Sequence, residues 1–133
     1  MNSPNRKTVS AISRDWNLAL RASQKPPVWD LGNLLDDFRC HCMTPEEKLA
    51  IVSDPPEPTG EPETDAYLAA MVETLCREAA IAPPAWTEGP STFMSKPWFA
   101  SGLQSLKAIL LAEAPVAFRR RNHFVSANAL HRV

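Results

Sequence analysis

The sequence predicts an all-α fold: a compact bundle of five to seven mostly short helices, interrupted by a Pro-rich connection. Three observations predict this class. Apolar residues recur at the 3.6-residue spacing of a helix in successive segments, and no segment shows the sustained alternation of a strand. Only 4 of the 133 residues are glycines, which is too few for the many tight turns of an all-β protein. The 13 prolines indicate short elements with stiff connections.

The N-terminal segment, residues 1–53, carries the first expected helices. One starts at Thr8 and ends before Pro26-Pro27, because the residue before a proline avoids the α region. Asp30 is the expected N-cap of the next helix. A third follows Thr44-Pro45-Glu46-Glu47, which has the sequence of a capping box with proline at the first helical position.

Residues 54–63 form the predicted connection. Prolines and acidic residues make up eight of these ten positions, so the segment suits neither a helix nor a central strand. We expect it to be extended and solvated. It separates the N-terminal segment from a C-terminal helical domain, residues 64–133, and we expect the two to pack as one compact unit.

The C-terminal domain is expected to begin with the strongest helix of the chain. Thr64 is its expected N-cap, and Pro83-Pro84 ends it. The aromatic stretch 85–101 should form short turns whose rings close over that helix as core residues. These rings are Trp86, Trp98 and Phe99. A further helix covers residues 103–110 and ends before Pro115.

Charge is unevenly distributed although the net charge is only −1. Residues 1–28 and 104–133 each carry five basic residues against one acidic residue, whereas residues 29–65 carry two against ten. A net charge near zero gives no global attraction to nucleic acid. Two interpretations stay open: the basic ends pair with the acidic middle inside one fold, or one basic end faces an acidic partner.

The cysteines and the apolar runs bear on location. Cys40, Cys42 and Cys76 are an odd number, and no apolar leader precedes them, so we expect free thiols in the cytoplasm. The longest apolar run, Ala108–Ala112, is far too short to span a bilayer. We therefore expect no membrane partner.

No metal site, cofactor site or catalytic residue is predicted. Cys40-His41-Cys42 supplies one close group of ligands, whereas zinc sites usually take two pairs with two to four residues within each pair. No nucleophile motif lies near a histidine, and no Gly-rich phosphate loop is present. The sequence therefore indicates a protein that is not an enzyme.

Arg119, Arg120, Arg121 and Asn122 are the predicted partner-binding residues. Three consecutive guanidinium groups repel one another and resist burial, while Phe118 and Phe124 are placed to anchor the segment. Arginine presents a planar fork that binds carboxylate or phosphate, so the partner is acidic protein or nucleic acid. The alternative is internal pairing with the acidic stretch Glu57–Asp65.

Several ordered stretches of the C-terminal domain carry a resemblance to a known family. They are Asp65–Ala70, Pro84–Trp86, Pro97–Phe99, Pro115–Arg121 and Phe124–Leu130. Together they resemble the C-terminal region of a poorly characterised bacterial family, similar to antitoxins encoded beside nucleotidyltransferase-like toxins. The resemblance implies a protein-binding module that neutralises a nucleotidyltransferase-type toxin by direct contact. The first 60 residues do not match a complete helix-turn-helix domain. The alternative is a small nucleic-acid-binding regulator that uses the C-terminal arginines, and the oligomeric state stays open.

Overall fold

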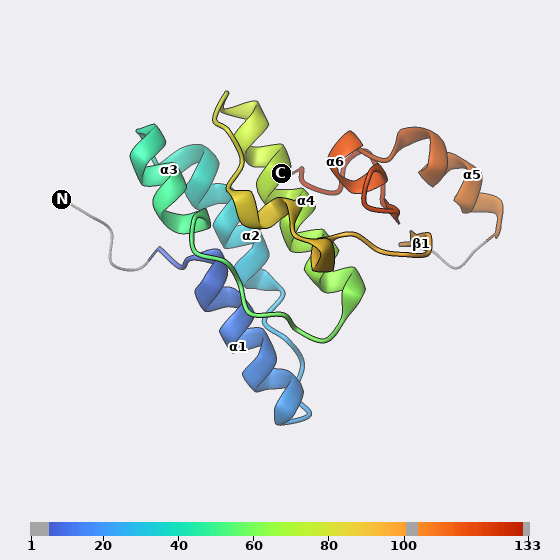
Figure 1. Ribbon diagram of the computed structural model, residues 1–133, viewed down its shortest axis with the longest axis horizontal. Helices are drawn as coiled ribbons and strands as arrows, with labels where there is room; N and C mark the ends of the chain where they lie inside the picture. The colour runs from blue at the N-terminus through green and yellow to red at the C-terminus, as the bar shows by residue number, and fades with distance from the viewer. Residues whose placement is uncertain (1–5, 101–103, 132–133) are drawn as a thin grey trace.

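The computed structural model describes residues 6–100 and 104–131. Within these ranges the elements are six α-helices, one π-helical turn, two 3-10 turns and a single two-stranded sheet, so the predicted all-α class is confirmed. The longest helix, α4 (Pro62–Glu78), lies in the middle of the molecule (Figure 1). Helices α1 (Val9–Arg21), α2 (Trp29–Asp36) and α3 (Pro45–Val52) lie on one side of it, and the C-terminal helices lie on the other.

Helix α2 starts one residue before the predicted N-cap. Val28 holds the N-cap position, and Asp30 lies in the first turn, where it is buried. There the Asp30 carboxylate accepts a hydrogen bond of 2.8 Å from Lys7 Nζ, and a negative charge in the first turn also suits the helix dipole. The N-cap prediction for Asp30 was therefore wrong. The helix continues as a π-helical turn, η1 (Asp37–His41).

The predicted capping box of α3 is confirmed. The Thr44 hydroxyl accepts a hydrogen bond of 3.1 Å from the Glu47 N–H, and a Glu47 carboxylate oxygen accepts one of 3.1 Å from the Thr44 N–H. Proline at the first helical position loses nothing there, because that N–H has no partner in a helix.

Replacing Thr44 by alanine should therefore lower the free energy of unfolding by about 1 kcal/mol, the usual cost of losing an N-cap hydroxyl. Urea denaturation measures it. Thr74→Ala is the matched control, because Thr74 lies inside α4 and its hydroxyl bonds only to the carbonyl of Ala70 at 2.8 Å. A loss at Thr44 no larger than the loss at Thr74 would contradict the capping role.

Helix α4 starts three residues earlier than a helix capped by Thr64 would. Glu61 holds the N-cap position and Pro62 the first helical position, whereas Thr64 lies inside the first turn. The Thr64 hydroxyl instead donates a hydrogen bond of 2.8 Å to Glu61 Oε1. The prediction of Thr64 as N-cap was wrong because proline at the first helical position lets the helix begin before it.

The Pro-rich connection between α3 and α4 is extended, and specific contacts hold it against the helices. Thr59 is buried, and both its N–H and its hydroxyl donate to Asp65 Oδ1, at 3.0 and 2.9 Å. Asn17 of α1 donates to the carbonyl of Pro58 at 3.2 Å. The connection is therefore mostly exposed, as predicted, and is held to the helices around the buried Thr59.

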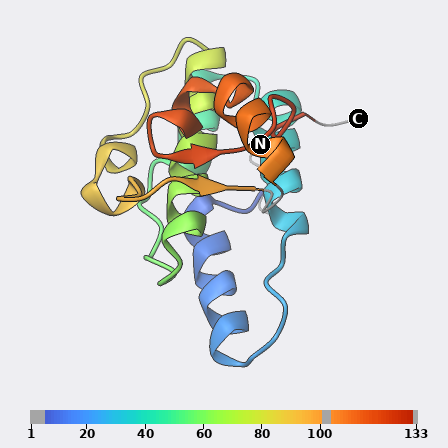
Figure 2. The ribbon, with the colours of Figure 1, turned by 90° about the vertical axis from the view of Figure 1, so that its right-hand side faces the viewer.

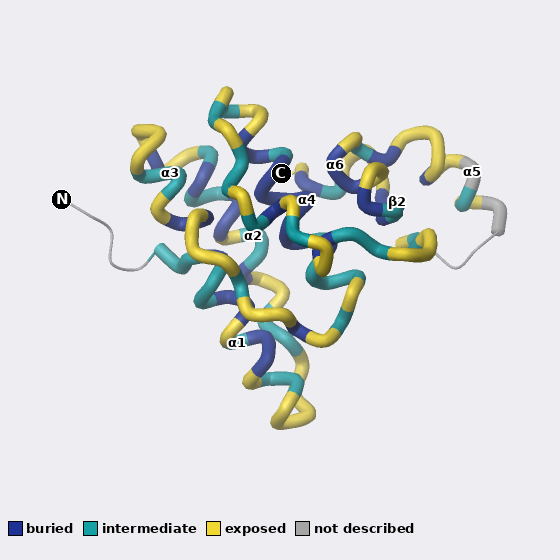
Figure 3. Tube along the Cα trace, in the orientation of Figure 1, coloured by how far each residue is buried: buried dark blue, intermediate teal, exposed yellow. Residues whose placement is uncertain are grey.

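The main hydrophobic core takes side chains from both halves of the chain. Helix α4 supplies a run of fully buried residues, which Figure 3 shows as the dark stretch through the centre. Residues before the connection and residues after α4 pack in the same cluster. Examples are Ile12, Leu34, Phe38, Val52, Phe118 and Leu130. None of the helices in the described ranges is both long and apolar enough to cross a bilayer.

The C-terminal elements include one short parallel pairing that the sequence did not predict. Strand β1 (Trp98–Phe99) pairs with β2 (His123–Phe124), with Trp98 opposite His123 (Figure 2). Along the chain, the two strands are separated by α5 (Gln104–Glu113) and α6 (Val116–Arg119). Two-residue strands are too short to show alternation, so no periodicity could have revealed them.

The predicted aromatic core residues lie at the edges of the core. Trp86 is half-buried against the main cluster, and its Nε1 donates a hydrogen bond of 2.8 Å to the carbonyl of Val52. Phe99 is also half-buried and stacks on Phe124, with ring centroids 5.1 Å apart. Trp98 is likewise half-buried. The expectation of full burial was wrong for all three rings, although each contacts a buried cluster or a buried side chain.

Candidate partner-binding site

The turn after α6 directs the predicted site residues in different directions. Asn122 has a φ of 62°, in the left-handed region that Asn tolerates better than most residues. Its side-chain amide donates a hydrogen bond of 2.9 Å to the carbonyl of Met94. Asn122 therefore reverses the chain into β2 and fastens the turn to the 90s segment, which is a structural role.

Arg121 is completely buried, with 0% of its surface exposed. Its Nη1 donates to Glu73 Oε1 at 2.5 Å and to the carbonyl of Ala117 at 2.8 Å, and its Nη2 donates to the carbonyl of Thr87 at 2.8 Å. The guanidinium also lies 4.8 Å from the ring centroid of Phe93. The expectation that Arg121 projects toward a partner was wrong: a buried carboxylate and two carbonyls bind its two terminal nitrogens inside the fold, while Nε is buried without a hydrogen-bond partner among the described residues.

Arg120 joins the same ion cluster from the surface. It forms a fork to Glu88, with two hydrogen bonds of 2.9 Å, and its Nη1 also lies 2.7 Å from Glu73 Oε1. These carboxylates, Glu88 first, raise the pKa of Arg120. Burial by itself would raise the pKa of Glu73, but hydrogen bonds from Arg121 and Arg77 outweigh it and hold that pKa below its usual range.

Arg120 and Arg121 thus pair internally, but not with the stretch that the sequence suggested. Their partners are Glu73 on α4 and Glu88 on the 3-10 turn η2 (Ala85–Glu88), rather than residues Glu57–Asp65. The sequence held one signal that could have predicted Glu73 as a partner. Glu73 shares its helix face with Ala69, Ala70 and Cys76, all fully buried. An acid on an apolar face requires a cation nearby, since a buried charge is costly without a partner.

Arg119 remains available to a partner. Its side chain is exposed and forms no hydrogen bond or ion pair with any residue in the described ranges. Its spacing of three residues from Val116 places both on one side of the short helix α6. Val116 is itself among the most exposed large apolar residues.

Among the side chains that the structure describes, helix α5 has few that pack against the rest of the molecule. It stands at one end of the molecule (Figure 1) and packs mainly through Leu110 against a small cluster with Ala114, Phe124 and Phe99. Its remaining large apolar residues are exposed. Together with the end of α6 they define what we call the α5–α6 surface: Leu106, Ile109, Leu111, Val116 and Arg119.

The Cys-His-Cys sequence is divided between the surface and the core. Cys40 and His41 are exposed, and His41 Nδ1 lies 2.8 Å from Asp37 Oδ1. Cys42 is buried, with its thiol 3.6 Å from the carbonyl of Glu47. Within residues 6–100 and 104–131, no three His, Cys, Asp or Glu side chains are grouped to hold a metal ion. The absence of a bound metal stays a prediction.

Only Cys40 should react quickly with a thiol reagent such as DTNB in the folded protein. Cys42 and Cys76 are buried, and burial raises the pKa of both thiols, that of Cys76 to about 11. A thiol reacts as its thiolate, so Cys42 and Cys76 should react with the reagent only after denaturant unfolds the chain. Cys40→Ser should remove the fast reaction altogether. Fast modification of Cys76 in the folded chain would contradict this packing.

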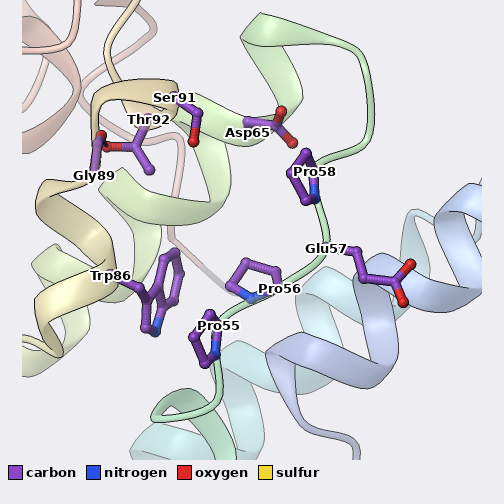
Figure 4. Close-up of a pocket in the computed structure, with 9 residues that line it drawn as sticks. All are labelled: Pro55, Pro56, Glu57, Pro58, Asp65, Trp86, Gly89, Ser91 and Thr92. Atoms are coloured by element: carbon purple, nitrogen blue, oxygen red, sulfur yellow. Dashed lines mark hydrogen bonds between the residues drawn. The ribbon is translucent and has the colours of Figure 1, made fainter.

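A pocket of about 240 Å³ lies between the Pro-rich connection and the turns η2 and η3 (Pro90–Thr92), as Figure 4 shows. The carboxylates of Glu57 and Asp65, which line it, both form hydrogen bonds that stabilise the fold. Glu57 points away from the pocket toward α1, where it accepts a hydrogen bond of 3.3 Å from Asn17, and Asp65 holds Thr59. The described side chains around it therefore form no acid–base pair or nucleophile–base pair.

Comparisons with protein-family models, with curated proteins and with solved structures give no match to this chain.

Proposed function

We propose that the chain is a protein-binding module, without enzyme activity, that contacts its partner through the α5–α6 surface. The observation that carries the proposal is the exposure of large apolar side chains around a helix that the fold supports on one narrow face. A helix that is apolar around most of its circumference is normally covered. Docking into a partner's groove is a common way to cover such a helix.

The resemblance of the C-terminal stretches to antitoxin-like proteins supplies the first partner to test. We accordingly propose that the module neutralises a nucleotidyltransferase-type toxin in the bacterial cytoplasm by direct contact. Arg119 contributes the charged edge of the surface, because an exposed arginine without an internal partner is suited to a carboxylate at an interface rim.

The arginine cluster offers less to nucleic acid than its sequence suggested. Arg120 and Arg121 already hold Glu73 and Glu88, so a phosphate would have to displace those carboxylates. Affinity for nucleic acid depends on the number of phosphates that free cations neutralise. Arg119 alone provides one such contact, and this observation favours a protein partner.

Substituting Ile109 by aspartate should weaken binding to the purified partner by at least about 30-fold, because apolar anchors at the centre of an interface contribute about 2 kcal/mol or more. The partner is first captured from the native host with the tagged chain and then produced alone. Isothermal titration calorimetry measures its affinity for the wild type and the variant. Relief of the toxin's growth inhibition by co-expression should be lost in parallel.

Leu18→Asp is the matched control. Leu18 on α1 is 53% exposed and Ile109 is 51% exposed, so both changes place the same charge at equally accessible positions. Loss of binding in the Leu18 variant with full binding in the Ile109 variant would contradict the assigned surface. Binding to nucleic acid that falls steeply with salt and disappears in Arg119→Gln would favour the alternative function.

A further inference from the structure

A second pocket, of about 260 Å³, lies where the first turns of α4 meet α1 and the short sheet. Its walls are mainly aromatic and aliphatic, and among the described residues that line it Glu63 alone carries a carboxylate. The side chains that matter for the argument are Trp16, Leu31, Tyr67, Trp98 and His123. Such a volume is near the lower end of small-molecule sites, which suits a ligand of one or two rings.

His123, which lines this pocket, carries an unsatisfied hydrogen-bond acceptor. Only 2% of its surface is exposed, and its Nε2 lies 3.1 Å from the carbonyl oxygen of Glu63. A carbonyl only accepts, so Nε2 carries the proton and Nδ1 carries the lone pair. Nδ1 is buried and has no hydrogen-bond partner among the described residues. Leaving a buried acceptor unpaired is costly, so this nitrogen favours a ligand that can donate a hydrogen bond to it.

We propose that this pocket binds a small, uncharged aromatic compound that carries one hydrogen-bond donor, and that His123 Nδ1 accepts the hydrogen bond from that donor. The aromatic walls favour a flat ring through stacking and edge-to-face contacts. A charged ligand is disfavoured because the walls offer little to replace its water shell. The proposal does not depend on the protein partner and goes beyond it.

The Trp98 ring packs directly against His123. In the unliganded structure its ring is the one nearest to His123, with centroids 4.6 Å apart, against 5.6 Å for Phe118 and 5.9 Å for Tyr67. Trp98 is half-buried and belongs to a strand of only two residues. Because Trp98 and His123 both line the pocket, binding should change the environment of the Trp98 indole.

Phenol and toluene form the test pair, because they have the same size and differ in one donor. A wholly apolar pocket prefers toluene, since a buried hydroxyl without a partner loses its water hydrogen bonds. With Nδ1 as acceptor, the folded full-length chain should bind phenol in roughly the millimolar range and at least about threefold more tightly than toluene. Two-dimensional ¹H–¹⁵N NMR titration follows binding, including the indole N–H signal of Trp98.

Two variants test separately whether binding needs the open pocket and whether it needs the His123 acceptor. Ala100→Trp places a large ring at an exposed position of the pocket rim and should abolish binding of both compounds, whereas Ala50→Trp on the exposed face of α3 should leave it unchanged. His123→Phe keeps a ring but removes the acceptor and should reverse the preference toward toluene. Because His123→Phe changes the core, Ala100→Trp keeps the test decisive if that variant does not fold.

Three results would overturn the proposal. They are no binding of phenol at about ten times the expected dissociation constant, equal or tighter binding of toluene by the wild type, and undiminished phenol binding by Ala100→Trp.

Discussion

Replacing Arg121 by methionine is expected to lower the free energy of unfolding by about 3–5 kcal/mol, the range found when one partner of a buried ion pair is removed. The reason is Glu73, which is 2% exposed and would keep a buried charge without its innermost partner. The carbonyls of Ala117 and Thr87 would also lose a donor. Urea denaturation followed by circular dichroism measures the loss.

A second substitution identifies the cause of that loss. Adding Glu73→Leu to Arg121→Met removes the buried carboxylate that has lost its innermost partner and should recover part of the stability, because apolar replacements of a whole buried ion pair are often tolerated. Arg77 and Arg120, which also contact Glu73, reach solvent and can be hydrated instead. A double variant less stable than Arg121→Met would contradict the argument that the buried Glu73 carboxylate causes the loss.

Stability should also fall by up to roughly 3 kcal/mol between pH 6.5 and pH 4, because His123 folds in its neutral form. Burial lowers its pKa from 6.5 to about 4. Between these values the unfolded chain binds a proton that the folded chain excludes. The contribution is therefore complete above pH 6.5 and is lost as the pH falls toward 4. Urea unfolding at successive pH values measures the slope.

The carboxylates titrate in a different window. Hydrogen bonds from arginines lower the pKa values of Glu73 and Glu88, so their contribution is present above the ordinary value of 4.5 and is lost only below it. Tyr67, which faces His123, has a pKa raised above 10 by burial and does not titrate in either window. His123→Phe should therefore flatten the curve between pH 6.5 and 4.5. A wild-type curve that is already flat there would contradict the burial of neutral His123.

The sequence predicted the start of a helix correctly where only one capping residue was available. Thr44-Pro45-Glu46-Glu47 formed its capping box as predicted. Thr64 failed as an N-cap because Pro62 offers an equally good first helical position two residues earlier. Proline at the first position and a hydroxyl residue at the cap are independent preferences, and only the surrounding contacts decide between them.

The arginine cluster shows why the candidate site could not be predicted from adjacent residues. Consecutive cations suggested a surface, but Arg121 faces Glu73, which is 48 residues away in the chain, and the packing of α6 on α4 creates that contact. The exposed residues of α5 belong to an apolar run that the sequence assigned to an ordinary amphipathic helix. Which side of that helix lacks support depends on the fold of the whole chain.

The position of Arg121 also changes what the resemblance indicates. The stretch Pro115–Arg121 supplies buried contacts through Ala117, Phe118 and Arg121, and Asn122 fastens the following turn. These residues build the C-terminal fold, so the stretch is informative about structure. On this account, the partner is bound by the neighbouring residues that the core does not use.

The central claim is that Arg120 and Arg121 stabilise the fold through internal ion pairs, whereas Arg119 faces outward. Urea unfolding of Arg119→Gln, Arg120→Gln and Arg121→Gln, side by side, tests it most directly. The account predicts a graded series: a loss under about 0.5 kcal/mol for exposed Arg119, about 1 kcal/mol for partly exposed Arg120, and about 3 kcal/mol or more for Arg121. Losses under about 1 kcal/mol at all three positions would contradict it, because they would mean that the arginines face solvent as a group.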